Sequence, residues 1–131
     1  MNKKLNSILL IDDDEPTNFL HELVIKKSNC TENCIVMPGG QKALDYLHTS
    51  TTPNLIFLDI NMPAMNGWEF LEAFRDLNIS QKDKIVIVML TTSLNPDEEE
   101  KSKLFKEVQD FKRKPLTNTM LQEIVEKYFH E

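Results

Sequence analysis

Glycine and cysteine are both scarce in this chain of 131 residues, which has three glycines and two cysteines. A glycine-rich phosphate-binding loop is not expected, because Gly39 and Gly40 lack the lysine and the spacing of such a loop and indicate a strand-to-helix turn. Cys30 and Cys34 have neither a C-x-x-C spacing nor a histidine cluster nearby, so we expect two free thiols and no metal or redox site. No serine, cysteine or histidine triad is recognisable.

Basic residues and long apolar runs are also in short supply. The chain has 15 basic and 21 acidic residues, a net charge of −6, which argues against nucleic acid as a direct partner because phosphate binding needs a basic surface. No apolar run reaches the roughly 18 to 20 residues that span a bilayer, and the N-terminal apolar stretch is too short for a secretory signal. We therefore expect a cytoplasmic protein without membrane insertion. The scattered histidines are expected to be surface or packing residues: His21, His48 and His130.

Short apolar runs that end in polar or charged residues are the most informative feature present. Four such segments follow in order, at residues 8–15, 55–63, 85–93 and 111–115. Runs of four to six residues rich in Ile and Val are typical of strands buried on both faces of a parallel sheet. Because ligands bind where such strands end, we expect the polar residues to meet at one edge of the sheet.

The predicted elements alternate between strand and helix within one domain. Apolar periodicity and turn residues predict strands at about residues 7–11, 34–37, 55–58, 85–90 and 110–113, each followed by a helix, with a polar connection at residues 78–84. Right-handed crossovers then favour an α/β, doubly wound, five-stranded parallel sheet in the order 2-1-3-4-5, with helices on both faces.

Two predicted helices carry further signals. Pro16 marks the start of the first, and Phe19, Leu20, Leu23 and Val24 recur at helical spacing up to about Lys27. The fourth begins at Asn95 and Pro96, so the acidic run at residues 97–100 indicates mostly a solvated face that complements the helix dipole and not a site.

Acidic residues follow two strands that the predicted order makes neighbours. Asp12, Asp13 and Asp14 repel one another, and a hard divalent cation such as Mg²⁺ would offset that repulsion. The alternative is an acidic loop that caps the following helix. Asp59 also follows a buried strand directly, which favours the metal site.

Thr91 and Lys114 come at the ends of the fourth and fifth predicted strands, near the same edge. Alone, Lys114 suits a solvated surface position and Thr91 a strand-end cap, but a shared edge favours a joint role. A carboxylate can itself accept a phosphoryl group, and a metal and a lysine neutralise the charge on the phosphoryl oxygens.

Four blocks in order resemble the receiver domain of two-component response regulators, of the single-domain, chemotaxis-regulator-like type. They are ILLIDDD at residues 8–14, LDINMPAMNG at 58–67, VMLTT at 88–92 and FKRKP at 111–115, and the resemblance covers roughly residues 7–130. It implies a flavodoxin-like fold and a signalling phosphoacceptor that is not an enzyme beyond its own phosphorylation and dephosphorylation. The implied phosphoryl donor is a histidine kinase or a histidine phosphotransfer protein.

The resemblance also implies roles for individual residues. Asp59 is the expected phosphoacceptor and Asp13 the direct Mg²⁺ ligand, with Asp12 acting through water and the backbone carbonyl of Asn61 completing the ligands. Lys114 is expected to pair with Asp59 and then with the phosphoryl group.

The expected switch residues are Thr91, which donates its hydroxyl to the phosphoryl group, and Phe111, which turns inward as Thr91 moves. Phe111 replaces the frequent tyrosine, and Thr92 stands where alanine is common. We expect residues 1–131 to be a single receiver domain with no output domain. Phosphorylation is then expected to act on an unidentified protein target through the face of the fourth helix, fifth strand and fifth helix.

Two alternatives remain. In a haloacid-dehalogenase-type phosphatase, the pattern Asp-x-Asp at residues 12–14 would supply the nucleophile, but no second acidic pair precedes the last helix after Lys114, and Asp59 is left without a role. A degenerate receiver would instead bind partners without accepting phosphate.

Overall fold

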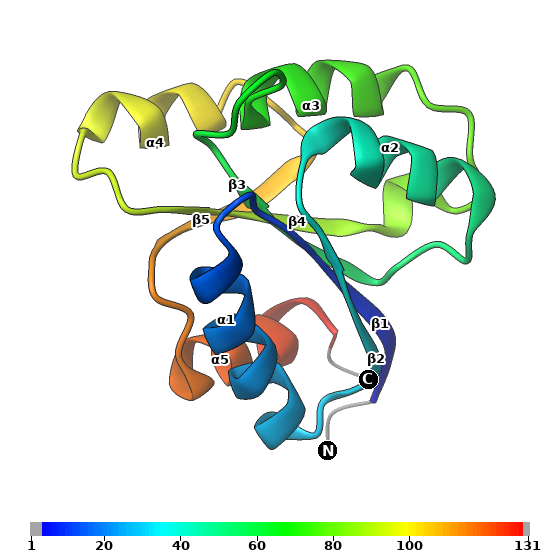
Figure 1. Cartoon of the computed structure of the whole chain (residues 1–131), viewed down its shortest axis with the longest axis vertical. Coiled ribbons are helices and arrows are strands. Elements are labelled where there is room, and N and C mark those ends of the chain that lie inside the picture. The colour runs from blue at the N-terminus through cyan, green and yellow to red at the C-terminus, as the bar shows by residue number, and fades with distance from the viewer. Residues whose placement is uncertain (1–3, 130–131) are drawn as a thin grey trace.

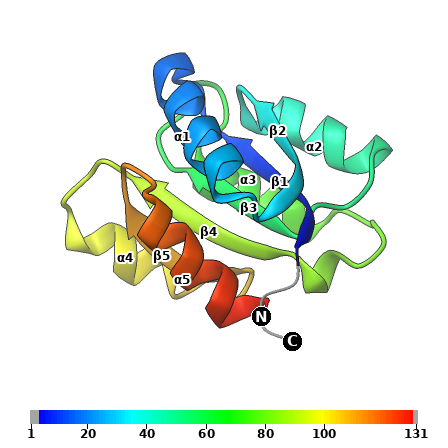
Figure 2. The same cartoon turned by 90° about the horizontal axis from the view of Figure 1, so that it is seen from below.

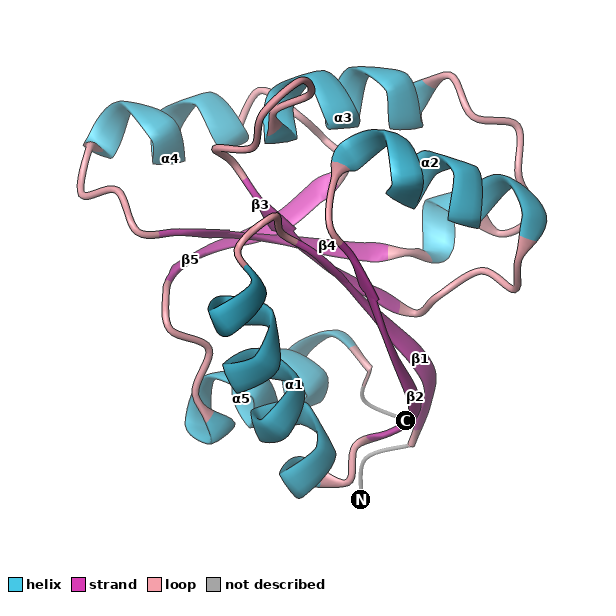
Figure 3. Ribbon diagram, viewed as in Figure 1, coloured by secondary structure: helices cyan, strands magenta, loops and turns pink. Residues whose placement is uncertain are grey.

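The computed structural model describes residues 4–129, in which five strands alternate with five α-helices (Figures 1 and 3). The strands are β1 Leu5–Ile11, β2 Thr31–Met37, β3 Leu55–Asp59, β4 Val86–Thr91 and β5 Val108–Arg113. The helices are α1 Glu15–Ser28, α2 Gly40–Thr49, α3 Gly67–Arg75, α4 Pro96–Ser102 and α5 Asn118–Tyr128, with a short 3₁₀ helix, η1, at Lys82–Lys84. The predicted alternation is confirmed, and η1 lies in the connection at residues 78–84 that the sequence predicted to be polar.

All five strands are parallel and lie in the order β2-β1-β3-β4-β5, which confirms the predicted topology. Helices α1 and α5 cover one face of the sheet, and α2, α3 and α4 cover the other (Figures 1 and 2). This division follows from right-handed crossovers, which place successive helices on opposite faces where the chain reverses direction along the sheet. The carboxyl ends of β1, β3, β4 and β5 therefore meet at one edge.

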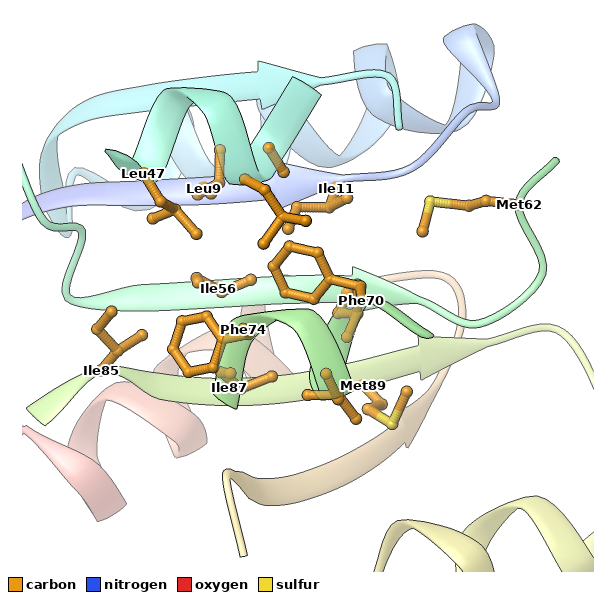
Figure 4. Packing of buried hydrophobic residues seen from close by; sticks show 14 of the residues in the cluster. Leu9, Ile11, Leu47, Ile56, Met62, Phe70, Phe74, Ile85, Ile87 and Met89 are labelled. Atoms are coloured by element: carbon orange, nitrogen blue, oxygen red, sulfur yellow. The ribbon is translucent and has the colours of Figure 1, made fainter. Parts of the chain in front are cut away.

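Two apolar cores hold the sheet between the helix layers. In the first, Phe70 and Phe74 of α3 lie over Ile56 of β3, between side chains of β1 and β4 (Figure 4). The second lies beneath α1 and α5 and includes Phe57 of β3 and Leu121 of α5. Every residue of β3 and β4 is buried, as their continuous apolar runs predicted.

Helix α1 departs from the pattern that predicted it. The helix forms where the spacing indicated, but Phe19, Leu20 and Leu23 are exposed at 64%, 52% and 40%. Its buried positions are instead Asn18, His21 and Ile25. Two polar side chains are buried there because each has a hydrogen-bond partner in a loop at the sheet edge, a tertiary contact that periodicity does not encode.

Cys30 and Cys34 are free thiols, both half-buried, and burial raises the pKa of Cys34 to about 12. His48 is exposed on α2, and His130 lies outside the described residues. Between residues 4 and 129, no helix combines the length and the apolar character needed to cross a membrane.

Candidate functional site

Three carboxylates converge at the carboxyl ends of β1 and β3. Asp12 directly follows β1, Asp59 is the last residue of β3, and the two strands are paired with Ile11 opposite Leu58. Asp12 and Asp59 are almost fully buried, at 5% and 7% exposed. Together with the exposed Asp13, each offers one oxygen within 4.8 Å of the other two. The structure thus brings together the acids that the sequence placed at one edge.

The ammonium group of Lys114 lies between two of these carboxylates. Its Nζ is 2.5 Å from Oδ2 of Asp12 and 3.0 Å from Oδ1 of Asp59, and the lysine side chain is only 9% exposed. The backbone N–H of Lys114 donates to the carbonyl of Thr91 at 2.8 Å, and the Lys114–Pro115 peptide bond is cis. The end of β5 therefore delivers a buried cation to the acids of β1 and β3.

The protonation states follow from burial and from these neighbours. Burial, and then the charge of Asp12, raise the pKa of Asp59 to about 6, although Lys114 opposes this. Burial alone would lower the pKa of Lys114, but hydrogen bonds and charges from Asp12 and Asp59 outweigh it and raise that pKa. The site thus places three acidic side chains around one lysine, so its acidic groups outnumber its basic ones.

This donor set fits a hard divalent cation. Carboxylate oxygens from Asp12, Asp13 and Asp59 are the ligands that Mg²⁺ prefers, and Mg²⁺ completes its octahedron with waters and phosphate oxygens. The exposed side of the site, at Asp13, gives those waters access. Asn61 stands two residues after Asp59 at the same edge, where its backbone carbonyl is the expected further ligand.

Asp14 has a different role from its two neighbours. Its carboxylate accepts hydrogen bonds from the backbone N–H and the hydroxyl of Thr17 and so caps α1. Its own N–H donates to Oδ1 of Asp12 at 3.0 Å, which helps to orient that carboxylate. The sequence left open whether these acids bind a metal or cap the following helix. Asp14 caps the helix, whereas Asp12 and Asp13 lie in the carboxylate cluster with Asp59.

Thr91, the last residue of β4, is fully buried, and its hydroxyl is held by α4. It donates to Oε1 of Glu98 at 3.1 Å and accepts the N–H of Ser93 at 2.9 Å. The acidic run of residues 97–100 is mostly a solvated face, as predicted, because three of its members are exposed, whereas Glu98 is half-buried and contacts Thr91. The sequence held a signal for this contact: Glu98 follows Thr91 by seven residues and lies in the first turn of the helix that comes after the strand.

Phe111 lies half-buried in β5, three residues before Lys114. Its ring packs against the core beneath α2 and α3, and the guanidinium carbon of Arg113 is 5.6 Å from the ring centroid. Since α4 packs against β5, Thr91 and Phe111 both lie beside the face on which α4 rests.

The backbone around Asp59 leaves no room for a side chain at Gly67. A Cβ at this first residue of α3 would lie 2.7 Å from the carbonyl oxygen of Asp59, closer than real Cβ atoms approach. The N–H of Gly67 donates to the carbonyl of Ile60 at 2.7 Å, and an Asn66–Glu69 capping box starts the helix. Gly67 thus lets α3 begin directly against the phosphoacceptor candidate.

Comparison with known proteins decides the family. The sequence profile described as "Response regulator receiver domain" matches residues 8–126, almost the whole chain. The chain belongs to this family of receiver domains. The expected flavodoxin-like fold and the place of the chain in two-component signalling are thereby confirmed.

Individual relatives agree with this assignment. The receiver is 35% identical over 97 residues to the response regulator Rcp1 of Synechocystis. This match covers 70% of the present chain and 65% of Rcp1, so the chain spans slightly less than two thirds of that relative's length. A two-component response regulator from Cytophaga hutchinsonii superimposes with a TM-score of 0.88 at 33% identity, covering 98% of this chain and 100% of that one. The phosphorylated cyanobacterial phytochrome response regulator RcpA gives a TM-score of 0.75 at 25% identity, covering 95% and 93%.

Proposed function

We propose that this receiver is a stand-alone response regulator that accepts a phosphoryl group on Asp59 in a Mg²⁺-dependent reaction. The observation that carries the proposal is the buried Lys114 ammonium, bonded to Asp12 and Asp59 beside a cluster of three carboxylates. The phosphoryl donor is a phosphohistidine of a histidine kinase or of a histidine phosphotransfer protein. The receiver catalyses only its own phosphorylation and dephosphorylation.

In the proposed reaction, a carboxylate oxygen of Asp59 attacks the phosphorus atom, and the bond from phosphorus to the donor nitrogen breaks. The donor imidazole leaves with the electron pair of that bond. Mg²⁺ held by Asp12, Asp13, Asp59 and the Asn61 carbonyl would neutralise charge on the phosphoryl oxygens. Lys114, which already lies 3.0 Å from Asp59, then turns its ammonium to a phosphoryl oxygen.

The switch begins at Thr91. A phosphoryl group on Asp59 offers new acceptor oxygens at the end of β3, the strand next to β4, and competes with Glu98 for the Thr91 hydroxyl. Loss of the Thr91–Glu98 hydrogen bond frees α4 from the end of β4. The inward turn of Phe111 is the second part of the proposed switch.

The proposed output is a change in the face formed by α4, β5 and α5, read by another protein. Leu94 and Leu104, on either side of α4, are each 80% exposed, which suits a protein contact.

The test is uptake of phosphate from acetyl phosphate, measured by intact-protein mass. We expect a gain of one phosphoryl group with Mg²⁺, and none with a chelator or in Asp59→Asn. The control Asp83→Asn changes an exposed acid in η1, at the opposite end of β4 from Thr91, and should gain the phosphoryl group normally. Continuous release of phosphate beyond the donor's own hydrolysis would instead indicate a phosphatase. No gain together with no Mg²⁺-dependent response to a phosphate mimic would indicate a degenerate receiver.

A further inference from the structure

A buried histidine on α1 contacts the loop that follows Lys114. His21 is 3% exposed, and its Nε2 accepts the backbone N–H of Leu116 at 3.1 Å. Pro115 has no N–H, so Leu116 carries the first backbone donor after Lys114. On the other side of Lys114, its own N–H is bonded to the carbonyl of Thr91. Thr91 therefore holds the backbone at Lys114 itself, and His21 holds it two residues later, at Leu116.

The same helix also fixes the loop of the acid to which Lys114 is bonded. Nδ2 of Asn18, three residues before His21 and on the same buried side of α1, donates to the carbonyl of Asp12 at 2.8 Å. Helix α1 thus contacts the backbone next to both members of the Asp12–Lys114 pair, whose charged atoms are 2.5 Å apart. A shift of either loop relative to α1 would change that separation.

The imidazole is in the form that this contact requires. Burial, and then the positive charge of Lys114, lower the pKa of His21, which keeps the ring neutral and leaves Nε2 with a lone pair. A cavity of about 10 Å³ is lined jointly by Asp12, Asn18, His21 and Asp59, so the ring lies directly behind the site. A residue that only filled space would need no acceptor facing Leu116.

We propose that His21 is a positioning residue for phosphoryl transfer, holding the Lys114 loop through Leu116 so that the ammonium faces Asp59. This inference rests on the proposed function, in which Lys114 stabilises the transferred group. His21 itself does not touch the reacting atoms.

The first test compares phosphorylation rates with acetyl phosphate at saturating Mg²⁺. His21→Leu, which removes the acceptor, should lower the rate constant about 5- to 10-fold, the effect of losing one hydrogen bond. His21→Gln, whose amide oxygen can accept from Leu116, should restore it to within about two-fold. Ile25→Val, a packing change on the same buried side of α1, should leave the rate unchanged. His21→Asn, too short to reach Leu116, replaces His21→Leu if that variant does not fold.

A double-mutant cycle separates positioning from general packing. In a Lys114→Met background, His21→Leu should cause no further loss of rate, because its effect passes through the lysine. The Mg²⁺ dissociation constant should stay within about two-fold of wild type, since the carboxylates do not depend on Leu116. An equal loss in both backgrounds, or full activity of folded His21→Leu, overturns the inference alone. A wild-type chain that gains no phosphoryl group overturns the proposed function and this inference with it.

Discussion

At the scale of single residues, the site is defined by charges kept together at a cost. Asp12 and Asp59 are buried side by side, and one lysine compensates only part of their repulsion. Burial and the charge of Asp12 raise the pKa of Asp59 to about 6, because both disfavour the ionised carboxylate. Such a site is poorly suited to stability and well suited to binding a cation and then a phosphoryl group.

Asp59→Asn should therefore stabilise the metal-free protein while abolishing phosphoryl uptake. The folded-state pKa of Asp59 lies above its ordinary value of 3.8, so the folded protein favours the protonated carboxyl. The contribution of Asp59 to the free energy of unfolding is therefore largest below about pH 4, where the group is protonated in both states. That stability is lost as the pH rises through about 6. At pH 7.5 the variant should gain on the order of 1 to 3 kcal/mol of unfolding free energy, measured by denaturant titration with a chelator present.

The pH profile supplies the control for this prediction. Between pH 4 and 7 the difference between wild type and Asp59→Asn should grow, whereas Asp83→Asn should follow wild type throughout. A constant or shrinking difference would show that Asp59 is not the group whose ionisation destabilises the fold.

At the scale of elements, the start of α3 determines the geometry around Asp59. Gly67→Ala places a Cβ against backbone atoms of Asp59 and Ile60, which cannot move aside as the end of a flexible side chain can. The substitution should cost about 1 to 3 kcal/mol in thermal or denaturant unfolding and slow phosphorylation. Gly39→Ala is the matched control, because a Cβ there has no heavy atom within 4 Å and the backbone is extended. Equal stability of the two variants would contradict the close packing at Gly67.

The contact between β4 and α4 makes a second prediction at this scale. Glu98→Ala removes the acceptor that holds the Thr91 hydroxyl, so the hydroxyl becomes free to turn toward Asp59. Since one hydrogen bond changes an equilibrium by roughly 2- to 10-fold, amide shifts of α4 in the unphosphorylated variant should move part-way toward their phosphorylated positions.

Glu99→Ala is the control for Glu98→Ala. It removes a similar charge from the first turn of α4, but its carboxylate does not contact Thr91. If both variants shifted the amide signals alike, the helix dipole and not the Thr91 contact would be the cause.

The elements also show what the sequence can and cannot predict. β3 and β4 are continuous apolar runs buried on both faces, so their identity and the meeting of Asp59 and Thr91 at one edge follow from local pattern. The buried side of α1 does not, because His21 is stabilised by an N–H 95 residues away. Glu98 was missed for a different reason: its contact with Thr91 spans only seven residues, but a charge near a helix start is usually solvated.

At the scale of the whole molecule, the acids of the site couple metal binding to folding. Separate strands and loops bring Asp12, Asp13 and Asp59 together only in the folded chain. Mg²⁺ at about ten times its dissociation constant should therefore raise the free energy of unfolding by about 1.4 kcal/mol. Thermal melting with increasing Mg²⁺ measures this, and Asp13→Asn should reduce the shift. An equal shift in Asp13→Asn would place the cation elsewhere.

The most direct test of the central claim is to locate the phosphoryl group after reaction with acetyl phosphate and Mg²⁺. Peptide mass mapping of the freshly modified chain is predicted to find a single phosphoryl group, on the peptide that contains Asp59. A group on the peptide that contains Asp12, Asp13 and Asp14 would contradict the account and revive an Asp-x-Asp phosphatase. An unmodified chain would leave a receiver fold that binds without accepting phosphate.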